Sequence, residues 1–235
     1  MTAAPALTVV IPTLNAAVML PATLACLAPL AGHHPSTGID MEILVVDGGS
    51  GDDTVAVARA GGARVISAPR GRGSQLAAGA DAATGRALLF LHADTRLDTQ
   101  ALLAIPAFLT DPRTDGRAGY FRLGLDDDAP AARRLERWVA HRCRWFALPY
   151  GDQGLLLSRS LYRGVGGFRR WPLMEDVDLV RRLGRTRLMA LDGTAITSAD
   201  RFRRAGYLRR SLRNLVCLTL YRLGVPAERI ARFYG

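Results

Sequence analysis

The sequence predicts an α/β fold in which helices sandwich a Rossmann-like, doubly wound and mostly parallel sheet, followed by a C-terminal helical tail. Short apolar runs alternate with helical patterns through about the first ninety residues, which predicts parallel strands joined by right-handed crossovers. The length of 235 residues and the hydrophobic fraction of 49% suit one large domain. We expect this domain over 1–200, with halves at about 1–110 and 111–200, and the tail over 201–235.

The expected elements follow from hydrophobic spacing and from the positions of Gly and Pro. In the first half, strands are expected at 7–12, 42–46, 63–67 and 87–91, with helices at 16–31, at 53–60 and from the loop 70–75 onward. In the second half, strands are expected at 118–123 and 155–157, with a basic, aromatic helix at 131–148. Leucines at helical spacing after Arg203 predict the helical tail.

Polar side chains follow three of the expected strands. They are Thr13 and Asn15 after the first strand, Asp47 after the second and Asp94 after the fourth. Because ligands of open α/β sheets bind at the carboxyl ends of the strands, these residues predict a binding site there. Two alternatives remain open: Asp94 as the N-cap of the next helix, and Asp47 as a turn carboxylate bound to Gly48 and Ser50.

The motifs of two common nucleotide-binding folds are absent. A dinucleotide-binding fold has Gly-x-Gly-x-x-Gly directly after its first strand, where this chain has Pro12–Ala17. A P-loop needs a lysine, and the sequence contains none, because every one of its 31 basic residues is Arg. The sequence therefore disfavours both folds.

Positive charge is concentrated at the C-terminus. Residues 1–110 hold 6 Arg and 8 acids (net −2), 111–200 hold 16 and 12 (net +4), and 201–235 hold 9 and 1 (net +8), which together give the +10 of the chain. This distribution suits an anionic membrane surface or a phosphate-bearing ligand, and we expect no nucleic acid partner.

The cysteines and the hydropathy indicate a cytoplasmic protein. Cys26, Cys143 and Cys217 are widely spaced and form no Cys-x-x-Cys pair, so we expect free thiols. No uncharged apolar stretch is long enough to span a bilayer, and no signal peptide is expected at the start of the chain.

The sequence resembles the nucleotide-sugar domain of family 2 glycosyltransferases, which have the GT-A fold. The matching segments are Val9–Asn15, Ile43–Ser50, Arg70–Gln75 with Ala78–Ala80, Leu89–Asp94, Gly166–Phe168 and Met174–Leu179. Their order and spacing agree with the family across roughly residues 7–185. The variant His92-Ala93-Asp94-Thr95 and the short length look most like a small bacterial subgroup found with radical-SAM or selenoprotein-associated genes.

The resemblance implies a site for a nucleotide-diphosphate sugar of UDP or GDP type. In the family, the carboxylate in the place of Asp47 holds the nucleobase or ribose. The implied donor-binding residues are Pro12, Thr13, Asn15, Asp47, Gly48, Ser50, Arg70, Arg72, Gln75, His92 and Asp94. Arg70 and Arg72 add positive charge beside the phosphates in this interpretation, and the alternative is that both are solvated.

By the same resemblance, Asp94 is the ligand of a divalent metal, Mn²⁺ or Mg²⁺. Such hard cations prefer carboxylate and phosphate oxygens, and they neutralise the charge that develops on the departing diphosphate. The chain departs from the family here, because the usual Asp-x-Asp is His92-Ala93-Asp94. Imidazole favours Mn²⁺ over Mg²⁺, so the replacement puts the strength and identity of metal binding in question.

Asp176 is the implied catalytic base of an inverting glycosyltransferase. Glu175 and Asp176 match the family's Glu-Asp motif, and neighbours on a helix point about 100° apart, so only one can face the acceptor. The alternative is that these acids only stabilise a helix N-terminus. The implied acceptor residues are Asp152, Gln153, Trp171 and Glu175.

The basic, apolar tail suits an interfacial helix that brings the site to a lipid acceptor at the inner face of the cell membrane. Packing on the sheet or in a dimer is the alternative. Similar enzymes use polyprenyl-phosphate, glycolipid or carotenoid-acid acceptors, which offer a hydroxyl or a carboxyl. Two other functions remain open: a nucleotidyltransferase, whose Gly-rich signature after the first strand is missing, and a non-catalytic basic protein that binds membrane or nucleic acid.

Overall fold

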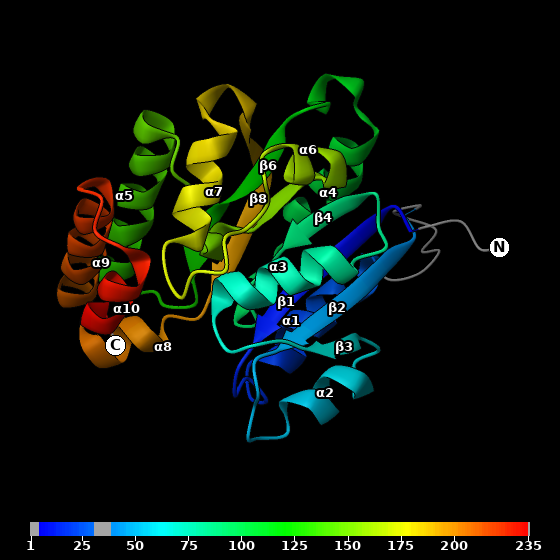
Figure 1. Cartoon of the computed structure of the whole chain (residues 1–235), viewed down its shortest axis with the longest axis horizontal. Helices are drawn as coiled ribbons and strands as arrows, with labels where there is room; N and C mark the ends of the chain where they lie inside the picture. Colours follow the sequence, from blue (N-terminus) through cyan, green and yellow to red (C-terminus); the bar gives the residue numbers. More distant parts are fainter. Residues whose placement is uncertain (1–4, 31–38, 235) are drawn as a thin grey trace.

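The computed structural model describes residues 5–30 and 39–234, and within them one sheet of eight strands (Figure 1). The strands are β1 Leu7–Thr13, β2 Met41–Asp47, β3 Arg64–Ser67, β4 Ala87–Phe90, β5 Thr95–Leu97, β6 Ala118–Leu125, β7 Leu155–Ser158 and β8 Leu188–Thr197. Their order across the sheet is β3-β2-β1-β4-β7-β6-β8-β5.

The first half of the sheet is parallel and the second half is mixed. Strand β1 pairs in parallel with β2 and β4, so that Val10 lies between Leu44 and Phe90. Strand β7 is antiparallel to both β4 and β6, whereas β6 and β8 are parallel and β5 returns antiparallel to β8. The prediction of a mostly parallel α/β sheet flanked by helices is confirmed.

Helices cover both faces of the sheet (Figure 1). They are α1 Leu20–Leu27, α2 Thr54–Ala60, α3 Arg72–Ala82, α4 Thr99–Thr110, α5 Pro130–Phe146, α6 Arg159–Gly164, α7 Glu175–Leu183, α8 Asp200–Ala205, α9 Tyr207–Arg222 and α10 Ala227–Tyr234. Side chains alternate along β1, so Val9 packs toward α1 and α4 while Val10 packs toward α3 and α7. The sheet is therefore buried on both sides in its centre.

Two glycines bring α3 close to the sheet and to a loop. A Cβ on Gly79 would lie 2.3 Å from a methyl of Val10, so the helix can pack this tightly only without a side chain there. A Cβ on Gly73 would lie 2.5 Å from the carbonyl oxygen of Trp171, and the Gly73 N–H donates to that oxygen at 3.2 Å. The N-terminus of α3 is thereby fixed against the loop before α7.

Several elements differ from the sequence prediction. The first helix begins at Leu20 rather than at 16, and the end expected for it at 31 lies outside the described residues. Helix α4 was not predicted; it carries Pro106 in its interior, and proline normally interrupts helices. Strands β5 and β8 were also not predicted, because β5 is only 3 residues long and β8 lacks a continuous apolar run.

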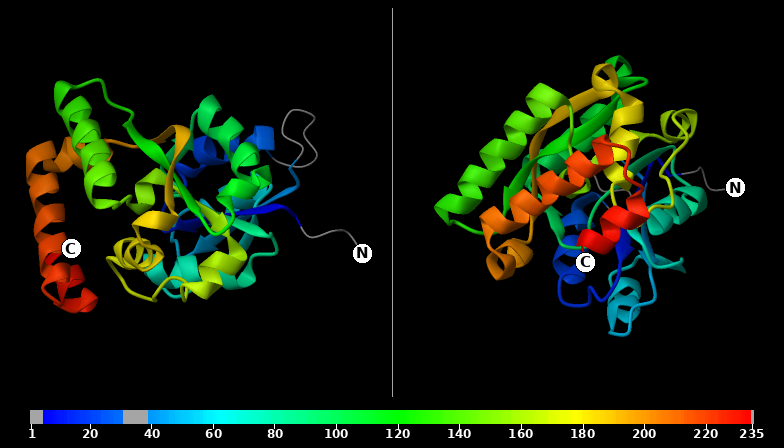
Figure 2. Two further views of the ribbon diagram at one scale, coloured as in Figure 1. Left: turned by 90° about the horizontal axis from the view of Figure 1, so that it is seen from above. Right: turned by 60° about the vertical axis from the view of Figure 1, so that its left-hand side comes forward.

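The C-terminal helices pack on the rest of the chain (Figure 2). Cys217 and Ile230 form a buried cluster with Leu173, Met174 and Val177, which lie in and just before α7. The predicted helical tail is therefore present, and one of its sides covers the region of α7. No helix in 5–30 and 39–234 combines the length and the apolar character needed to cross a membrane.

Candidate active site

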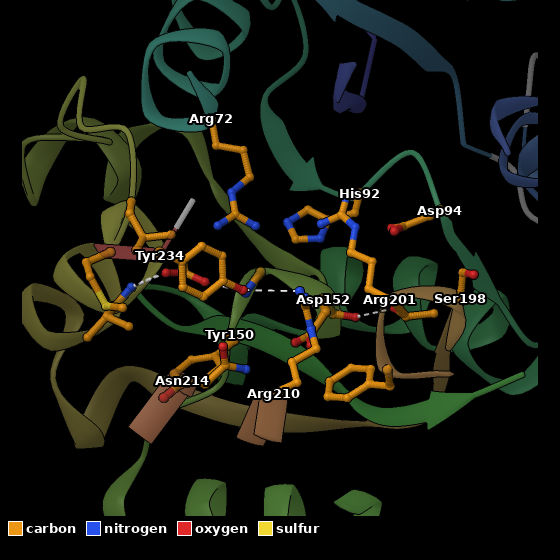
Figure 3. A pocket seen from close by; sticks show the side chains of 17 residues that line it. Arg72, His92, Asp94, Tyr150, Asp152, Ser198, Arg201, Arg210, Asn214 and Tyr234 are labelled. Atoms are coloured by element: carbon orange, nitrogen blue, oxygen red, sulfur yellow. Dashed lines mark hydrogen bonds between the residues drawn. The ribbon is translucent and has the colours of Figure 1, made fainter. Parts of the chain in front are cut away.

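One pocket collects polar side chains from distant parts of the chain (Figure 3). It lies beyond the end of β4, and seven segments of the chain form its walls. Its polar and aromatic lining residues are Arg72, His92, Asp94, Tyr150, Asp152, Asp176, Thr197, Ser198, Arg201, Phe202, Arg210, Asn214 and Tyr234. The predicted donor residues Arg72, His92 and Asp94 thus meet the predicted acceptor residue Asp152 and the predicted base Asp176.

Backbone hydrogen bonds hold the loop that carries Asp94. The hydroxyl of Thr23 in α1 donates to the Ala93 carbonyl at 2.8 Å, and the Ser198 N–H donates to the Asp94 carbonyl at 3.0 Å. The N-cap of the following helix α4 is Asp98, whose carboxylate accepts from the Ala101 N–H at 2.8 Å. Asp94 is therefore not that cap, and its side chain lines the pocket.

His92 is a neutral imidazole pressed against a glycine. Burial and the nearby Arg72 guanidinium lower the pKa of His92 to about 4, so the ring carries no charge near neutral pH and keeps one nitrogen lone pair. A Cβ on Gly151 would lie 2.7 Å from Nε2 of His92 and 3.5 Å from Oδ2 of Asp176. Glycine at 151 therefore allows the imidazole to sit beside the Asp176 carboxylate.

The two acids at the start of α7 face different surroundings. Asp176 lines the pocket, and its Oδ2 accepts from the Gly151 N–H at 2.9 Å. Glu175 is 1% exposed and pairs with Arg72 at 2.8 Å, while its Oε2 has no hydrogen-bond partner in the part of the chain that the structure describes. Burial raises the pKa of Glu175 to about 7, even though the Arg72 charge acts in the opposite direction. Of the two, Asp176 is the one placed at the pocket wall.

Asp152 adds a second buried carboxyl to the pocket. Its Oδ1 is buried, and no described residue makes a hydrogen bond to it. Burial raises the pKa of Asp152 to about 6, against the charge of Arg142, and the neighbouring Asp176 and Asp94 act in the same direction as burial. Carboxyls crowded in this way favour a proton or a cation between them.

The donor residues predicted after β1 and β2 bind one another. The Asp47 carboxylate accepts from the Gly49 and Ser50 N–H groups, both at 2.9 Å, from the Ser50 hydroxyl at 2.5 Å and from the Thr13 hydroxyl at 3.3 Å. Burial opposes ionisation, but these hydrogen bonds lower the pKa of Asp47 below its usual value. This geometry is that of the turn carboxylate, and a nucleobase contact by Asp47 stays a prediction.

The other donor residues predicted from sequence do not line the pocket, and Gln75, Gly48 and Asn15 lie around the Asp47 turn. Nε2 of Gln75 donates to the Thr13 and Val46 carbonyls at 2.7 and 2.8 Å, and Gly48 lies against the same side chain. Asn15 is exposed, and its Oδ1 accepts from the Gly51 N–H at 2.9 Å. Pro12 is buried in β1, and Arg70 is exposed before α3.

Besides Glu175, two predicted acceptor residues, Gln153 and Trp171, lie outside the pocket wall. Gln153 is buried, and its side chain donates to the Phe121 carbonyl at 2.9 Å and accepts from the Tyr150 N–H at 3.2 Å. The ring of Trp171 is 6.3 Å from that of Tyr221. Gln153 thus holds the loop of Tyr150 in place, and an acceptor role for Gln153 and Trp171 stays a prediction.

The sequence analysis missed the pocket residues of the C-terminal half. They are Tyr150, Thr197, Ser198, Arg201, Phe202, Arg210, Asn214 and Tyr234. The signal available in the sequence was the net +8 of residues 201–235 together with interleaved aromatic residues. Charge composition alone does not separate arginines that line a pocket from arginines on the surface, so the fold was needed to find them.

The pocket offers oxygen ligands for a hard cation. Asp94 presents a carboxylate, and Asp152 has a buried oxygen without a partner. Within the described ranges, no group of three or more His, Cys, Asp or Glu side chains forms a complete metal cage. Mg²⁺ and Mn²⁺ commonly bind through one or two carboxylates together with substrate phosphates, so these residues fit such an ion.

Comparisons with known proteins agree with this geometry. The family model described as "Glycosyl transferase family 2" matches residues 8–170. A PGL/p-HBAD biosynthesis glycosyltransferase of Mycobacterium tuberculosis is 38% identical over 193 residues, which cover 75% of this chain and 68% of the relative. The chain belongs to glycosyl transferase family 2, and it is a glycosyltransferase.

Solved structures with a similar fold include complexes with a nucleotide sugar and a metal ion. A mannosyltransferase of Pyrobaculum calidifontis in complex with GDP-Man and Mn²⁺ superposes with a TM-score of 0.62 at 22% identity, over 88% of this chain and 63% of that chain. Glucosyl-3-phosphoglycerate synthase of M. tuberculosis in complex with Mn²⁺ and UDP-glucose superposes with a TM-score of 0.60 at 21% identity, over 94% and 80%. At these identities the likeness shows the GT-A fold.

Proposed function

We propose that the chain is an inverting hexosyltransferase that moves a sugar from a nucleotide-diphosphate donor of UDP or GDP type to a hydroxyl or carboxyl acceptor. The proposal rests on one observation, that Asp94 and Asp176 line the same pocket. The Asp94 carboxylate can bind a metal ion beside the diphosphate, and the Asp176 carboxylate can accept the proton of the acceptor. The donors GDP-Man and UDP-glucose in the structures of similar fold support the donor class.

Asp176 is the proposed catalytic base. In a single displacement, the acceptor oxygen bonds to the anomeric carbon, the bond from that carbon to the diphosphate breaks, and the acceptor proton passes to the Asp176 carboxylate. The Gly151 N–H bonded to Oδ2 holds the carboxylate in place. The neutral His92 beside it adds no charge that would neutralise the base.

Asp94 is the proposed metal ligand, and His92 and Asp152 lie in the same pocket. A bound Mn²⁺ or Mg²⁺ supplies charge that stabilises the departing nucleoside diphosphate. Arg72 lines the pocket next to His92, and its pairing with Glu175 aims the guanidinium at this region. We propose that Arg72 binds the diphosphate, while the turn around Asp47 and Asn15 lies on the side of the nucleobase.

The proposal is tested by isothermal titration of the protein with UDP, GDP, CDP and dTDP, each with Mn²⁺, with Mg²⁺ and with a chelator. We expect one nucleotide to bind only with metal, and Asp94→Ala to lose that binding at least tenfold. Exposed Asp81→Ala on α3, which lies outside the pocket, is the matched control and keeps the affinity. If none of the four nucleotides binds under any condition, the proposed donor site is wrong.

A lipid acceptor at the membrane is the finer part of the proposal. Helices α5 and α9 contact each other at the outer edge of the molecule (Figure 2). They expose large apolar side chains, which include Trp138, Trp145, Phe146, Leu208, Leu212 and Leu215. Exposed Arg134, Arg137 and Arg222 lie on the same two helices. Tryptophan and arginine together suit the interface of an anionic bilayer, and polyprenyl phosphates, glycolipids and carotenoid acids are acceptors located there.

Vesicle binding tests the membrane contact. We expect the protein to co-sediment with phosphatidylglycerol vesicles and not with phosphatidylcholine vesicles, and the double variant Trp138→Ser, Trp145→Ser to reduce the bound fraction at least fivefold. Leu103→Ser, a change at an exposed leucine on α4, is the control and binds like the wild type. Equal binding of the double variant would remove this surface from the proposal.

The comparisons reduce the number of functions that need to be considered. Because the chain belongs to a glycosyltransferase family, we no longer propose the nucleotidyltransferase or the non-catalytic basic protein that the sequence left open. The finer placement in a small bacterial subgroup associated with radical-SAM or selenoprotein genes stays a prediction that rests on the His92-Ala93-Asp94-Thr95 variant.

A further inference from the structure

Two arginines of the C-terminal helices enter the pocket without a carboxylate partner. Arg201 on α8 and Arg210 on α9 both line it (Figure 3). The ion pairs found over 5–30 and 39–234 involve neither of them. Arg72, by contrast, already pairs with Glu175. Arg201 and Arg210 therefore bring positive charge that no acidic side chain of the described residues balances at short range.

Aromatic and hydroxyl groups orient the Arg210 guanidinium. Its Nη2 donates to the Tyr234 hydroxyl at 3.1 Å, and its Cζ lies 5.1 Å from the centre of the Phe202 ring. Its Nε is buried and has no hydrogen-bond partner within 5–30 and 39–234. A buried donor without an acceptor is costly, commonly about 1–3 kcal/mol, so an acceptor supplied by a ligand would stabilise this arrangement.

Three other arginines act on Arg210 with charge of the same sign. Burial lowers the pKa of Arg210, the Tyr234 oxygen opposes this, and the charges of Arg201, Arg213 and Arg72 add to it. An anion placed at Arg210 would relieve the repulsion and would accept from a planar fork of N–H groups, a geometry that matches phosphate and carboxylate.

We propose, on the basis of the function proposed above, that Arg210 and Arg201 form a subsite for an anionic group of the acceptor, a phosphate or a carboxylate. Asn214 and the Tyr234 hydroxyl supply neutral hydrogen bonds at the same wall. In Figure 3, Arg210, Asn214 and Tyr234 lie on the side of the C-terminal helices, whereas Asp94 lies on the loop after β4. The acceptor would thus be selected by its charge at one wall while the donor is held at the other.

The donor diphosphate offers the same chemistry, so the experiment separates the two sources. The protein is first saturated with Mn²⁺ and the nucleoside diphosphate that it binds, and phenyl phosphate is then titrated by calorimetry, with phenol as the neutral counterpart. We expect phenyl phosphate to bind at least tenfold more tightly than phenol. Arg210→Gln weakens phenyl phosphate binding at least tenfold and changes the nucleotide affinity less than twofold, and Arg210→Lys gives an intermediate loss.

The matched control is Arg229→Gln, which removes an exposed arginine of α10 outside the pocket and leaves both affinities unchanged. Equal binding of phenyl phosphate by wild type and Arg210→Gln, or no preference over phenol in the wild type, would overturn the proposal. A parallel loss of nucleotide affinity in Arg210→Gln would assign the arginine to the donor diphosphate and would also overturn it. If no nucleotide binds, the function proposed above fails, and the same titration on the free protein still tests the subsite.

Discussion

The turn after β2 and the pocket wall formed by the C-terminal helices are both polar, but they differ in how many of their buried polar groups have hydrogen-bond partners. At the turn, the Asp47 carboxylate receives four hydrogen bonds from Thr13, Gly49 and Ser50. At the pocket, Arg210 Nε on this wall and Asp152 Oδ1 in the turn after α5 are buried, and neither has a hydrogen-bond partner among the described residues. The hydrogen bonds of the Asp47 carboxylate are made within the protein, whereas the pocket has buried polar atoms that a ligand can bind.

This difference separates a rigid support from a reactive surface. A carboxylate held by several N–H and O–H donors is fixed in position and strongly ionised, which suits the shaping of a loop. Buried groups without partners carry an energetic cost that binding can recover. We infer that substitutions at the turn act first on stability, and that substitutions at the wall and at α7 act first on binding and turnover.

The largest effect is expected for Asp176→Asn. An amide cannot accept the acceptor proton, so kcat should fall by roughly 10²–10⁴-fold, the usual contribution of a general base. The side-chain oxygen can still accept from the Gly151 N–H, so the thermal midpoint should change little. Steady-state kinetics and thermal unfolding, together with titration of the donor nucleotide, measure these quantities. Normal turnover by this variant would place the base elsewhere.

A smaller effect is expected for Gly151→Ala. The new methyl would lie 2.7 Å from Nε2 of His92, so the imidazole must move, and Asp176 beside it loses its alignment. We expect kcat to fall roughly 10–100-fold, because misplacement by about 1 Å costs on the order of 10²-fold. Gly164→Ala is the control, since a methyl group added there would have no neighbouring atom within 4 Å. Similar kinetics of the two variants would show that His92 does not constrain the site.

Sequence patterns were sufficient for the parallel half of the fold. Strands β1, β2 and β4 are buried on both faces, and polar residues lie at or just beyond their carboxyl ends, so local pattern and tertiary environment agree there. Strand β8 and helix α4 were not predicted, because Gly193 interrupts the pattern of the strand and Pro106 interrupts the pattern of the helix. In both cases tertiary packing outweighs local preference, since Gly193 lies directly against Ala101 of α4.

Two parts of the candidate site could be predicted from the sequence. Asp94 lies in a family motif just after a strand, and Asp176 lies in a family motif at the start of a helix. The site was not predictable where the tail folds back, because Arg210 lies far from Asp94 in sequence and reaches the pocket only through the packing of α9 and α10 near α7. The same limit applies to Gln153, which motif position assigns to the acceptor and which the structure places in a buried hydrogen-bond network. Position in a motif does not reveal how many partners a polar group already has.

The smallest effect, and the sharpest test of the comparison, is expected for Asp47→Asn. An amide nitrogen cannot accept, so in either orientation of the new amide one pair of donors, the Gly49 and Ser50 N–H groups or the Ser50 and Thr13 hydroxyls, loses its acceptor, at a cost of about 1–3 kcal/mol. For a chain of this size, that lowers the thermal midpoint by roughly 2–10 °C. Asp53→Asn is the control, because Asp53 makes no side-chain cap hydrogen bond at α2 and its loss should leave the midpoint unchanged. A loss of UDP or GDP affinity above tenfold with an unchanged midpoint would contradict the comparison, because Asp47 would then act on the ligand rather than on the turn.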